Sequence, residues 1–396
     1  MPKILAINAG SSTLKWKLFQ MPEEHVIASG MVDRMGLSNS EFKVKYGDDK
    51  KYVVNQDIPT AEMAVDMLLK ALIELKIITD YKEIQGVGHR IVAGGERFKE
   101  SERLDEKSLK EVEALAEYAP LHNPAEAEGI KAFMKLLPGV PEIGVFDTSF
   151  HSTMPKMNYL YSIKPEYYEK YGARKYGAHG TSHRYVSHRA AEMLGKDLKD
   201  LKMVTMHLGS GVSITAEKDG VSFDTSMGFT PLAGVTMSTR SGDIDASLVA
   251  FLMQKLHITD PEDMVNILNK ESGIYALSGL SPDMRELEQT RHERPESQLA
   301  IDIFVNRIVK YVAGYIAEMG GIDALVFTAG MGEGDIVMRK RIIDALSVFG
   351  AKIDDERNNV MAKERLISSD DSKVKVLLVP TNEELMIARD VMRLGK

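Results

Sequence analysis

The sequence contains no cysteine among its 396 residues. Disulfide bonds and thiolate metal sites are therefore excluded, and the composition fits a reducing compartment, so we expect a cytoplasmic protein. No apolar run approaches the length of a membrane span, and Met1-Pro2-Lys3 leads directly into an apolar segment without a signal-peptide core. A formal net charge of −8 disfavours nucleic acid as a partner. We expect neither a membrane nor a nucleic acid to be bound.

The chain does have the length and composition of a globular protein with more than one core. Hydrophobic residues make up 44% and charged residues 27% of the sequence, values typical of globular domains. A chain of 396 residues is too long for one ordinary core, so two domains are expected.

The N-terminal stretch combines a strand, a turn of small residues and a second strand. Ile4–Ile7 is a short apolar run that predicts a buried strand. The turn Asn8–Ser12 follows, and the next segment alternates, with Leu14, Trp16 and Leu18 on one face. Turn amides, hydroxyls and a lysine suit a phosphate, because glycine lets the backbone approach closely. An ordinary hairpin has the same features, so this stretch alone leaves both interpretations open.

The same pattern returns later in the chain. Met203 to Ala216 again runs as an apolar strand, a turn with Gly-Ser and an alternating strand, so that Asn8, Gly10 and Ser11 align with His207, Gly209 and Ser210. We therefore expect two repeated domains, 1–150 and 151–382, with the C-terminal helix 383–396 as a candidate to pack back on the first. Strands alternating with helices predict an α/β fold with mixed sheets, in which ligands bind at strand ends.

Periodicity and turn residues place the elements of each half. In the first half they predict strands at 26–32, within 41–54 around a turn at 47–49, at 84–92 and at 142–146. They also predict one helix that begins at 59–60 and two helices that span 105–118 and 124–136. In the second half they predict strands within 203–224, joined by an Asp219-Gly220 turn, and at 324–328 and 374–379. The helices predicted there span 243–256, 261–269, 297–319, 335–349 and 383–394.

Short polar clusters follow several of these strands. A strand-end arginine usually serves as an ion-pair partner and a Gly-x-Gly turn is common, so each cluster alone is weak evidence. Together with the two repeated turns they predict an anion-binding site. The clusters are Gly88–Arg90, Phe146–Ser149, Tyr176–His183, Thr239–Asp243, Thr328–Gly334 and Thr381–Glu384.

The histidines of one cluster allow a metal interpretation. His179, His183 and His188 have spacings that helical zinc sites use. No suitably spaced acidic ligand accompanies them, and His179 precedes Thr181-Ser182, which we expect to be the helix N-cap. We therefore favour a histidine at the helix entry that donates a hydrogen bond to an oxyanion.

Eight motifs together carry a family resemblance. N-A-G-S-S-T-L-K, G-H-R-I-V, F-D-T-S-F-H, H-G-T-S-H, H-L-G-S-G, T-R-S-G-D, G-x-G-E and P-T-N-E-E occur in an order and spacing that resemble the acetate kinase family. They cover essentially the whole chain. The resemblance implies two duplicated RNase H-like domains of the actin-like ATPase type, with the active site in the cleft between them. It also implies a homodimer that uses ATP/ADP and Mg²⁺, for which Mn²⁺ can substitute, to phosphorylate acetate reversibly to acetyl phosphate by direct in-line transfer.

The resemblance also implies a role for individual residues. The metal would be held near Asn8 and Glu383. The catalytic residues would be Asp147, His179 and Arg240. The substrate would be bound by Arg90, Val92, Leu121 and Pro231. The nucleotide would contact Lys15, His207, Leu208, Gly209, Ser210, Gly211, Asp283, Met284, Arg285, Gly330, Met331, Gly332, Glu333 and Gly334.

Physical chemistry supports most of these roles. A carboxylate and a polyphosphate repel each other, so Arg90 on the first and Arg240 on the second would bring them together, with His179 as a further donor. Magnesium keeps several waters, so one or two oxygen ligands such as Glu383 are enough. Because a carboxylate nucleophile is already ionised at neutral pH, we expect Asp147 to orient an arginine or a metal-bound water rather than to act as a base.

Three residues depart from the family pattern. Ala178 stands where a phenylalanine often precedes the histidine, Ala93 where a histidine is frequent, and Gly334 where an asparagine is usual. Because alanine at 178 would enlarge the acyl pocket, a propionate kinase or broad short-chain acyl kinase is the alternative within the enzyme class. From a different class, an actin- or Hsp70-like ATP-binding switch would need no carboxylate-binding Arg90.

Overall fold

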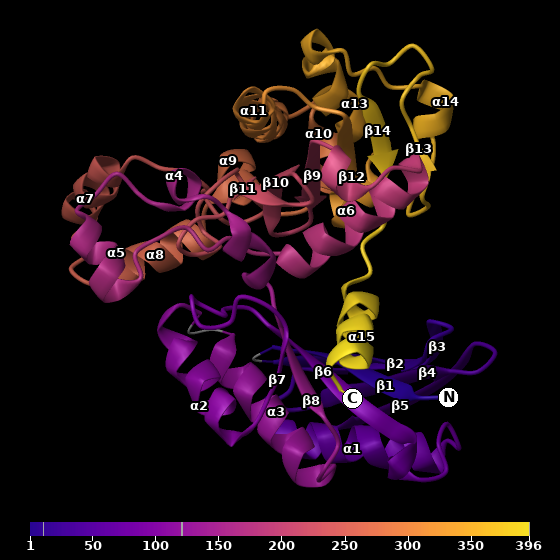
Figure 1. Cartoon of the computed structure of the whole chain (residues 1–396). Helices are drawn as coiled ribbons and strands as arrows, with labels where there is room; N and C mark the ends of the chain where they lie inside the picture. Colours follow the sequence, from indigo (N-terminus) through magenta and orange to yellow (C-terminus); the bar gives the residue numbers. More distant parts are fainter. Residues whose placement is uncertain (11, 120–121, 396) are drawn as a thin grey trace. The chain divides into compact units, whose positions relative to one another are not determined.

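The computed structural model describes residues 1–10, 12–119 and 122–395 (Figure 1). The chain divides into two compact units, one formed by Met1–Ser152 with Asn382–Lys396 and the other by Thr153–Thr381. Two predicted positions, Ser11 of the repeated turn and Leu121 of the acyl pocket, lie outside the described residues. Within the described ranges, no helix combines the length and the apolar character that crossing a bilayer requires.

The first unit is built on a mixed sheet of eight strands in the order β5-β4-β3-β2-β1-β6-β8-β7. β1 pairs antiparallel with β2, and β1, β6 and β8 pair in parallel. The predicted N-terminal hairpin is present, with Asn8 opposite Lys15. The strands are β1 Lys3–Ala9, β2 Thr13–Gln20, β3 His25–Asp33, β4 Ser40–Tyr46, β5 Lys50–Gln56, β6 Ile84–Ile91, β7 Glu102–Arg103 and β8 Glu142–Phe146.

Helices cover both faces of the central strands of this sheet. α3 packs on one face, where the His89 and Phe133 rings lie 5.4 Å apart, and α15 packs on the other face against β1 and β6. The first unit contains α1 Ala61–Glu74, α2 Glu106–Ala114, α3 Asn123–Leu136, α15 Glu383–Leu394 and the 3₁₀ turns η1 Tyr81–Glu83, η2 Leu115–Glu117 and η3 Ser149–Thr153, of which the last residue belongs to the second unit.

Two glycines let α15 lie directly on β6. A Cβ at Gly86 would be 2.4 Å from Val391 Cγ1, and a Cβ at Gly88 would be 2.3 Å from Ile387 Cγ2. Only glycine allows a helix to approach a strand this closely. Side chains alternate along a strand, so Arg90 follows Gly86 and Gly88 on the face of β6 that α15 covers.

The second unit has a mixed sheet of six strands in the order β11-β10-β9-β12-β14-β13. The predicted Asp219-Gly220 turn joins β10 and β11, and both residues have the positive φ (56° and 81°) that a tight hairpin turn requires. The strands are β9 Met203–Leu208, β10 Val212–Lys218, β11 Val221–Thr225, β12 Ala324–Thr328, β13 Arg365–Leu366 and β14 Lys375–Leu378.

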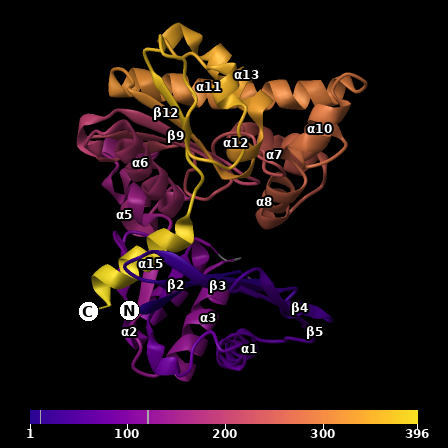
Figure 2. The same cartoon turned by 90° about the vertical axis from the view of Figure 1, so that its right-hand side faces the viewer.

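The long helix α11 closes the apolar core of the second unit (Figure 2). Its buried Ile301, Phe304, Ile308 and Val312 belong to the same core cluster as the apolar face of β9 and β10. The unit contains α4 Lys156–Tyr159, α5 Pro165–Tyr171, α6 Gly180–Leu194, α7 Ala246–Lys255, α8 Pro261–Lys270, α9 Gly273–Ser278, α10 Met284–Thr290, α11 Pro295–Met319, α12 Ala329–Gly334, α13 Ile336–Ala345, α14 Asp355–Asn358, η4 Leu198–Asp200 and η5 Ser347–Phe349.

The two sheets repeat one topology. The order β3-β2-β1-β6-β8 in the first unit and β11-β10-β9-β12-β14 in the second unit both begin with two antiparallel pairings and continue with two parallel ones. β1 and β2 thus correspond to β9 and β10, as the sequence echo predicts. The predicted α/β fold with two repeated halves is confirmed.

Some predicted helix boundaries are wrong because local capping decides them. The helix predicted from 243 begins at Ala246, since the Asp245 side chain accepts hydrogen bonds from the amides of Ser247 and Leu248. The helix predicted over 335–349 ends at Ala345 and continues as a 3₁₀ turn.

Candidate functional site

Three predicted residues meet at the carboxyl ends of the parallel strands in the first unit. Asn8, Arg90 and Asp147 lie at the ends of β1, β6 and β8, which are neighbours in the sheet. Arg90 Nη1 donates to Asn8 Oδ1 at 3.3 Å, and Arg90 Nη2 donates to Asp147 Oδ2 at 2.6 Å. Asp147 is 1% exposed, so this charged pair is well shielded from water. The predicted substrate arginine is therefore held rigidly by a predicted catalytic carboxylate.

Helix α15 brings a fourth predicted residue, Glu383, to the same group. Burial raises the pKa of Glu383 to about 7, the Arg90 guanidinium opposes the rise, and Asp147 adds to it. The buried Oε1 of Glu383 has no hydrogen-bond partner within the described part of the chain. A buried carboxylate oxygen without a partner is costly unless something binds it.

A buried carboxylate that the sequence reasoning missed lies beside Arg90. Glu126 on α3 is 2% exposed, and its Oε2 accepts from the amide of Val92 at 3.1 Å. Burial raises the pKa of Glu126 to about 8, although Arg90 opposes the rise. Its position on the buried stripe of α3, three residues after the buried Asn123, was the available signal in the sequence.

The loop after β6 is fixed by side chains from other elements. Asn123 Oδ1 accepts from the amide of Ala93 at 3.1 Å, and Thr148 Oγ1 accepts from the amide of Gly94 at 2.9 Å. Val92 is buried in a small apolar cluster with Ala93 and Ala119. Ala93, which departs from the family pattern, thus packs as a small core residue.

The proposed acyl pocket is only partly described. Val92 belongs to the first unit, whereas Pro231 and Ala178 belong to the second, where Ala178 is 3% exposed and joins the main core cluster. Leu121 lies outside the described residues. The grouping of these residues around an acyl chain stays a prediction.

The second unit gathers its own predicted residues around the turn between β9 and β10. A Cβ at Gly211 would lie 3.3 Å from His179 Nε2 and 3.4 Å from Arg240 Nη1, so both side chains converge on this glycine. Arg240 Nη1 also donates to the Pro231 carbonyl at 3.2 Å, and burial lowers the pKa of Arg240. His179, Arg240 and the predicted nucleotide turn therefore share one small region.

His179 is held in an uncommon backbone conformation. It is the N-cap of α6 with φ 56° and ψ 24°, in the left-handed region that side chains other than glycine rarely adopt. The expected N-cap at Thr181-Ser182 is wrong, because the Ser182 hydroxyl instead donates to Thr381 Oγ1 and contacts His207 Nδ1. His179 stacks on His207 with ring centroids 4.1 Å apart. Strain of this kind is typical of residues placed for function.

The predicted G-x-G-E turn is a short helix, α12, and its first residue, Ala329, has a left-handed backbone conformation (φ 63°). Glu333 Oε1 accepts from the amides of Ala329 at 2.9 Å and Thr381 at 3.1 Å, so this side chain joins the ends of β12 and β14. Arg339 is fully buried and donates to the carbonyls of Gly332 and Glu333. The hydrogen bonds of Glu333 and Arg339 therefore hold the α12 segment in place.

Among the residues that the structure describes, the predicted nucleotide residues Asp283–Arg285 and Lys15 lie outside the hydrogen-bond network of the other predicted nucleotide residues. Asp283 caps α10 and pairs with Arg285 at 2.6 Å, while Met284 is buried. Within the described part of the chain, no hydrogen bond or ion pair joins these three residues to 209–211 or 329–334. Lys15 is exposed on β2 opposite Asn8.

Hydrogen bonds engage two of the histidines that were considered for a zinc site. Both ring nitrogens of His183 are hydrogen-bonded, to Thr205 and Ser213, and His188 Nδ1 bonds the carbonyl of Arg184. His183 therefore has no ring nitrogen left for a metal, and the described residues contain no group of three or more histidine or acidic side chains that could hold a metal ion.

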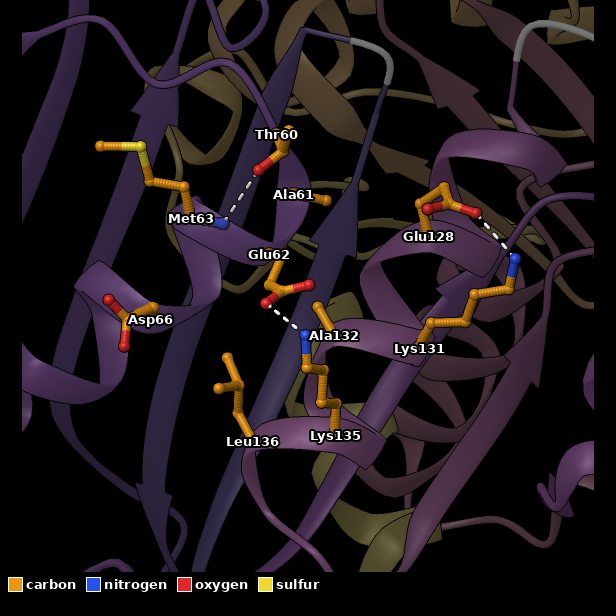
Figure 3. A pocket seen from close by; sticks show the side chains of 10 residues that line it. All are labelled: Thr60, Ala61, Glu62, Met63, Asp66, Glu128, Lys131, Ala132, Lys135 and Leu136. Carbon is orange, nitrogen blue, oxygen red and sulfur yellow. Dashed lines mark hydrogen bonds and ion pairs between the residues drawn. The ribbon is translucent and has the colours of Figure 1, made fainter.

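A surface hollow between α1 and α3 lies apart from these residues (Figure 3). Its charges are already paired, since Lys135 bonds Glu62 and Lys131 bonds Glu128. It runs along the C-terminal half of α3, whereas Asn123 and Glu126 are at the beginning of that helix. We assign no function to it.

Known proteins resemble this chain over its whole length. The chain is 64% identical to acetate kinase 1 of Latilactobacillus sakei over 394 residues, and each sequence is covered completely. Its structure resembles that of an acetate kinase from Porphyromonas gingivalis (TM-score 0.95, 42% identity) and that of a propionate kinase from Francisella tularensis (TM-score 0.93, 39% identity), with full coverage of all chains.

These likenesses agree with the repeated sheet topology. The predicted fold class, two duplicated RNase H-like domains of the actin-like ATPase type, is confirmed by the shared fold. The model of the acetokinase family matches residues 3–389. The chain therefore belongs to the acetokinase family.

Proposed function

We propose that this protein is an acetate kinase, which reversibly transfers the terminal phosphoryl group of ATP to acetate and so forms acetyl phosphate and ADP. The observation that carries the proposal is Arg90, a half-buried cation fixed at a strand end by Asn8 and Asp147. The full-length identity of 64% to a protein named acetate kinase supports the same substrate class.

Arg90 would hold the acetate carboxylate. Burial works against the charge of Arg90, but Asp147, Glu383 and Glu126 outweigh it and raise the pKa of the guanidinium. It therefore stays charged at every physiological pH. A guanidinium can bind a carboxylate through two parallel hydrogen bonds, which also orient the attacking oxygen.

Asp147 would act by orienting Arg90 rather than by removing a proton. Its Oδ2 accepts from Arg90 Nη2, and acetate needs no base. If this is right, Asp147→Asn should lower kcat and weaken the metal dependence of the reaction. Nearly full activity with an unchanged magnesium requirement would contradict the role.

His179 and Arg240 would contact the phosphoryl group during transfer. Both side chains converge on Gly211 in the second unit. Phosphoryl transfer depends mainly on alignment and on neutralising the negative charge of the equatorial oxygens. One guanidinium and one imidazole donor beside a small glycine turn provide such neutralisation.

The residues near Arg90 fit a magnesium ion. The partnerless buried Oε1 of Glu383 and the amide oxygen of Asn8 are the hard oxygen ligands that Mg²⁺ prefers, and magnesium needs few protein ligands because it keeps several waters. When bound there with ATP, the ion would neutralise phosphate charge. Mn²⁺ would be accepted by the same oxygen ligands.

The nucleotide would be bound by the second unit at the carboxyl ends of its strands. His207 lies opposite Thr328 in the parallel pairing of β9 with β12, which brings 207–211 beside the start of α12. Gly330 and Gly334 have open space where a Cβ would be, so a ligand can approach the backbone. We propose Lys15 and Asp283–Arg285 as further contacts.

Trapping of the product tests this function. Incubation with ATP, Mg²⁺ and hydroxylamine should yield acyl hydroxamate from acetate, and Arg90→Ala should abolish it. Arg97→Ala serves as the matched control, because Arg97 is an exposed arginine of the same unit that pairs with Glu102 and Glu111. Absence of hydroxamate with any short acid would favour an ATP-binding switch.

Propionate is the second candidate substrate. Ala178 leaves more room than the phenylalanine of the family pattern, and one solved relative is named a propionate kinase. The same assay with acetate, propionate and butyrate decides the preference. A kcat/KM for propionate equal to or above that for acetate would make the protein a short-chain acyl kinase.

We further propose that the protein is a cytoplasmic homodimer. The exposed apolar side chains of Leu248, Phe251 and Leu256 on and after α7 support self-association. Analytical ultracentrifugation tests this state, and Phe251→Glu should shift a dimer toward monomer.

A further inference from the structure

The strands β9 and β10 bury two faces of opposite character. One face is apolar and belongs to the core under α11. The other face carries Thr205 on β9 and Ser213, Thr215 and Glu217 on β10, and every one of these polar side chains is at most 1% exposed. α6 packs against β9 on the polar side, where His183 bonds both Thr205 and Ser213. Polar residues buried in this way need hydrogen-bond partners.

These residues form one continuous chain of hydrogen bonds that ends at His179. Glu217 Oε1 lies 2.8 Å from Thr205 Oγ1, which lies 2.7 Å from His183 Nδ1. His183 Nε2 lies 2.7 Å from Ser213 Oγ, which lies 2.9 Å from His179 Nδ1. We call this set, Glu217, Thr205, His183, Ser213 and His179, the histidine relay.

The donors and acceptors along the histidine relay can be arranged in only two ways. Within the described residues, the side-chain oxygens of Thr205 and Ser213 each bond only their two relay neighbours. Each hydroxyl has one proton, so it donates to one neighbour and accepts from the other. A neutral His183 also donates from one nitrogen and accepts at the other. Which group donates in the Glu217–Thr205 bond therefore determines which group donates in the Ser213–His179 bond.

Glu217 decides which direction is used. If its carboxylate is ionised, Thr205 donates to it, and a neutral His179 must carry its proton on Nδ1. If the carboxyl group is protonated, it donates to Thr205, every later bond reverses, and Ser213 donates to His179 Nδ1. Nε2 of a neutral His179 then carries the proton.

The surroundings of Glu217 favour the protonated carboxyl group. It is 1% exposed and has no ion-pair partner within the described part of the chain. Burial raises the pKa of Glu217 to about 8, although the neighbouring Thr205 and Ser187 hydroxyls act to lower it. Its Oε2 has no hydrogen-bond partner among the described residues, so Oε1 is the oxygen from which a proton can be donated. From α6, the titratable side chain of His183 bonds the same Thr205 hydroxyl as Glu217 does.

We propose that the histidine relay holds a proton on Nε2 of His179, so that this atom donates to the phosphoryl group in the reaction proposed above. Nε2 is the nitrogen on the Gly211 side, toward Arg240. A neutral donor there stabilises charge that develops on the phosphoryl oxygens. Glu217, Thr205, His183 and Ser213 are thus positioning residues, and the inference rests on the proposed function.

Thr205→Val and Thr215→Val form a matched pair of variants. The two threonines lie directly opposite each other in the β9–β10 pairing, and both are fully buried. Thr215 bonds Thr225 at 2.9 Å and is outside the relay. We expect Thr205→Val to lower kcat at least tenfold, with KM values for acetate and ATP within twofold, and Thr215→Val to stay within threefold of the wild type. Equal losses in both variants would overturn the proposal.

Glu217→Gln provides the conservative rescue. The amide can donate to Thr205 as the protonated carboxyl does, but it cannot ionise. We expect near wild-type kcat at pH 7 and no loss of kcat above pH 8, where the wild type loses activity as Glu217 ionises. Glu217→Leu, which cannot donate, should lose at least tenfold at both pH values. A glutamine variant as impaired as the leucine variant, or with the same alkaline loss as the wild type, would overturn the relay.

The tautomer of His179 tests the relay without relying on activity. In protein labelled with ¹⁵N-histidine, the His179 signals can be assigned by their loss in His179→Gln. We expect protonation at Nε2 at pH 7 and a shift toward Nδ1 in Thr205→Val and in Ser213→Ala. A proton on Nδ1 in the wild type, or a His179 tautomer that is the same in the wild type and in both variants, would refute the relay. If the tautomer responds as expected but no acyl phosphate forms, the proposed function fails and the relay stands.

Discussion

Gly211→Ala tests whether the convergence of His179 and Arg240 matters for the reaction. The new Cβ would lie 3.2 Å from His179 Cε1, 3.3 Å from His179 Nε2 and 3.4 Å from Arg240 Nη1. These distances are shorter than most carbon contacts in proteins, so both side chains must move by a few tenths of an ångström. His179 has little freedom to do so, because Ser213 and the stacked His207 hold its ring.

The expected effect is on catalysis rather than on folding. Displacing two groups aligned with a transferring phosphoryl should lower kcat by about 10- to 100-fold, which corresponds to about 1.4–2.7 kcal/mol of barrier. Gly211 does not have a positive φ, so alanine fits its backbone and removes unfolded-state freedom worth about 0.4–1 kcal/mol. This gain offsets the crowding, and the melting temperature should change by less than about 3 °C.

The assay is steady-state acyl-hydroxamate formation with saturating ATP and acetate, combined with thermal unfolding. Gly314→Ala is the matched control, since Gly314 is exposed on α11 and a Cβ there meets nothing within 4 Å. It should keep wild-type kcat and gain about 0.5–1 kcal/mol of stability. If Gly211→Ala keeps wild-type kcat, the two side chains do not act where they converge.

Four further substitutions probe other parts of the structure. Arg240→Ala should lower kcat by about 10³–10⁵-fold, as removal of phosphoryl-contacting arginines does, and a tenfold loss or less would contradict its role. Ala178→Phe should lower the ratio of kcat/KM for propionate to that for acetate. Because residue 178 is buried, the larger side chain should also lower the free energy of unfolding by about 1–3 kcal/mol. An unchanged ratio would show that residue 178 does not line the acyl pocket. Arg339→Met should cost at least about 3 kcal/mol in urea unfolding and raise the KM for ATP, because it leaves the buried carbonyls of Gly332 and Asn358 without donors; a stable variant with unchanged KM would refute this. The raised pKa of Glu217 means that the folded protein holds a proton that the unfolded chain has lost between about pH 4.5 and pH 8, so stability falls as pH rises. Glu217→Gln should therefore gain up to about 4 kcal/mol relative to the wild type between pH 5 and pH 8, and parallel pH profiles would contradict the assignment.

Local patterns were sufficient to predict many of the elements. The strands 142–146 and 324–328 and the helix 383–394 agree with β8, β12 and α15 residue by residue. Asn8, Arg90 and Asp147 were predicted at strand ends, and parallel pairing of β1, β6 and β8 necessarily brings such ends together. The echo of the first hairpin around His207 likewise predicted the repeated sheet.

Other features depend on contacts between distant segments and were not predicted. In the sequence, Glu126 is one polar residue on a predicted helix, and only the folded structure places it beside Arg90 and Val92. The alternating polar face of β9 and β10 is typical of a solvent-exposed face, yet α6 buries it and makes it a relay.

By itself, the sequence determined the periodicities, the turns and the order of motifs, because these depend on interactions between residues close along the chain. Only the tertiary structure decided the ionisation of Glu217, the strained backbone of His179 and the place of Glu383 beside Arg90. Each of these depends on burial and on a partner from a remote segment, and a linear pattern contains neither.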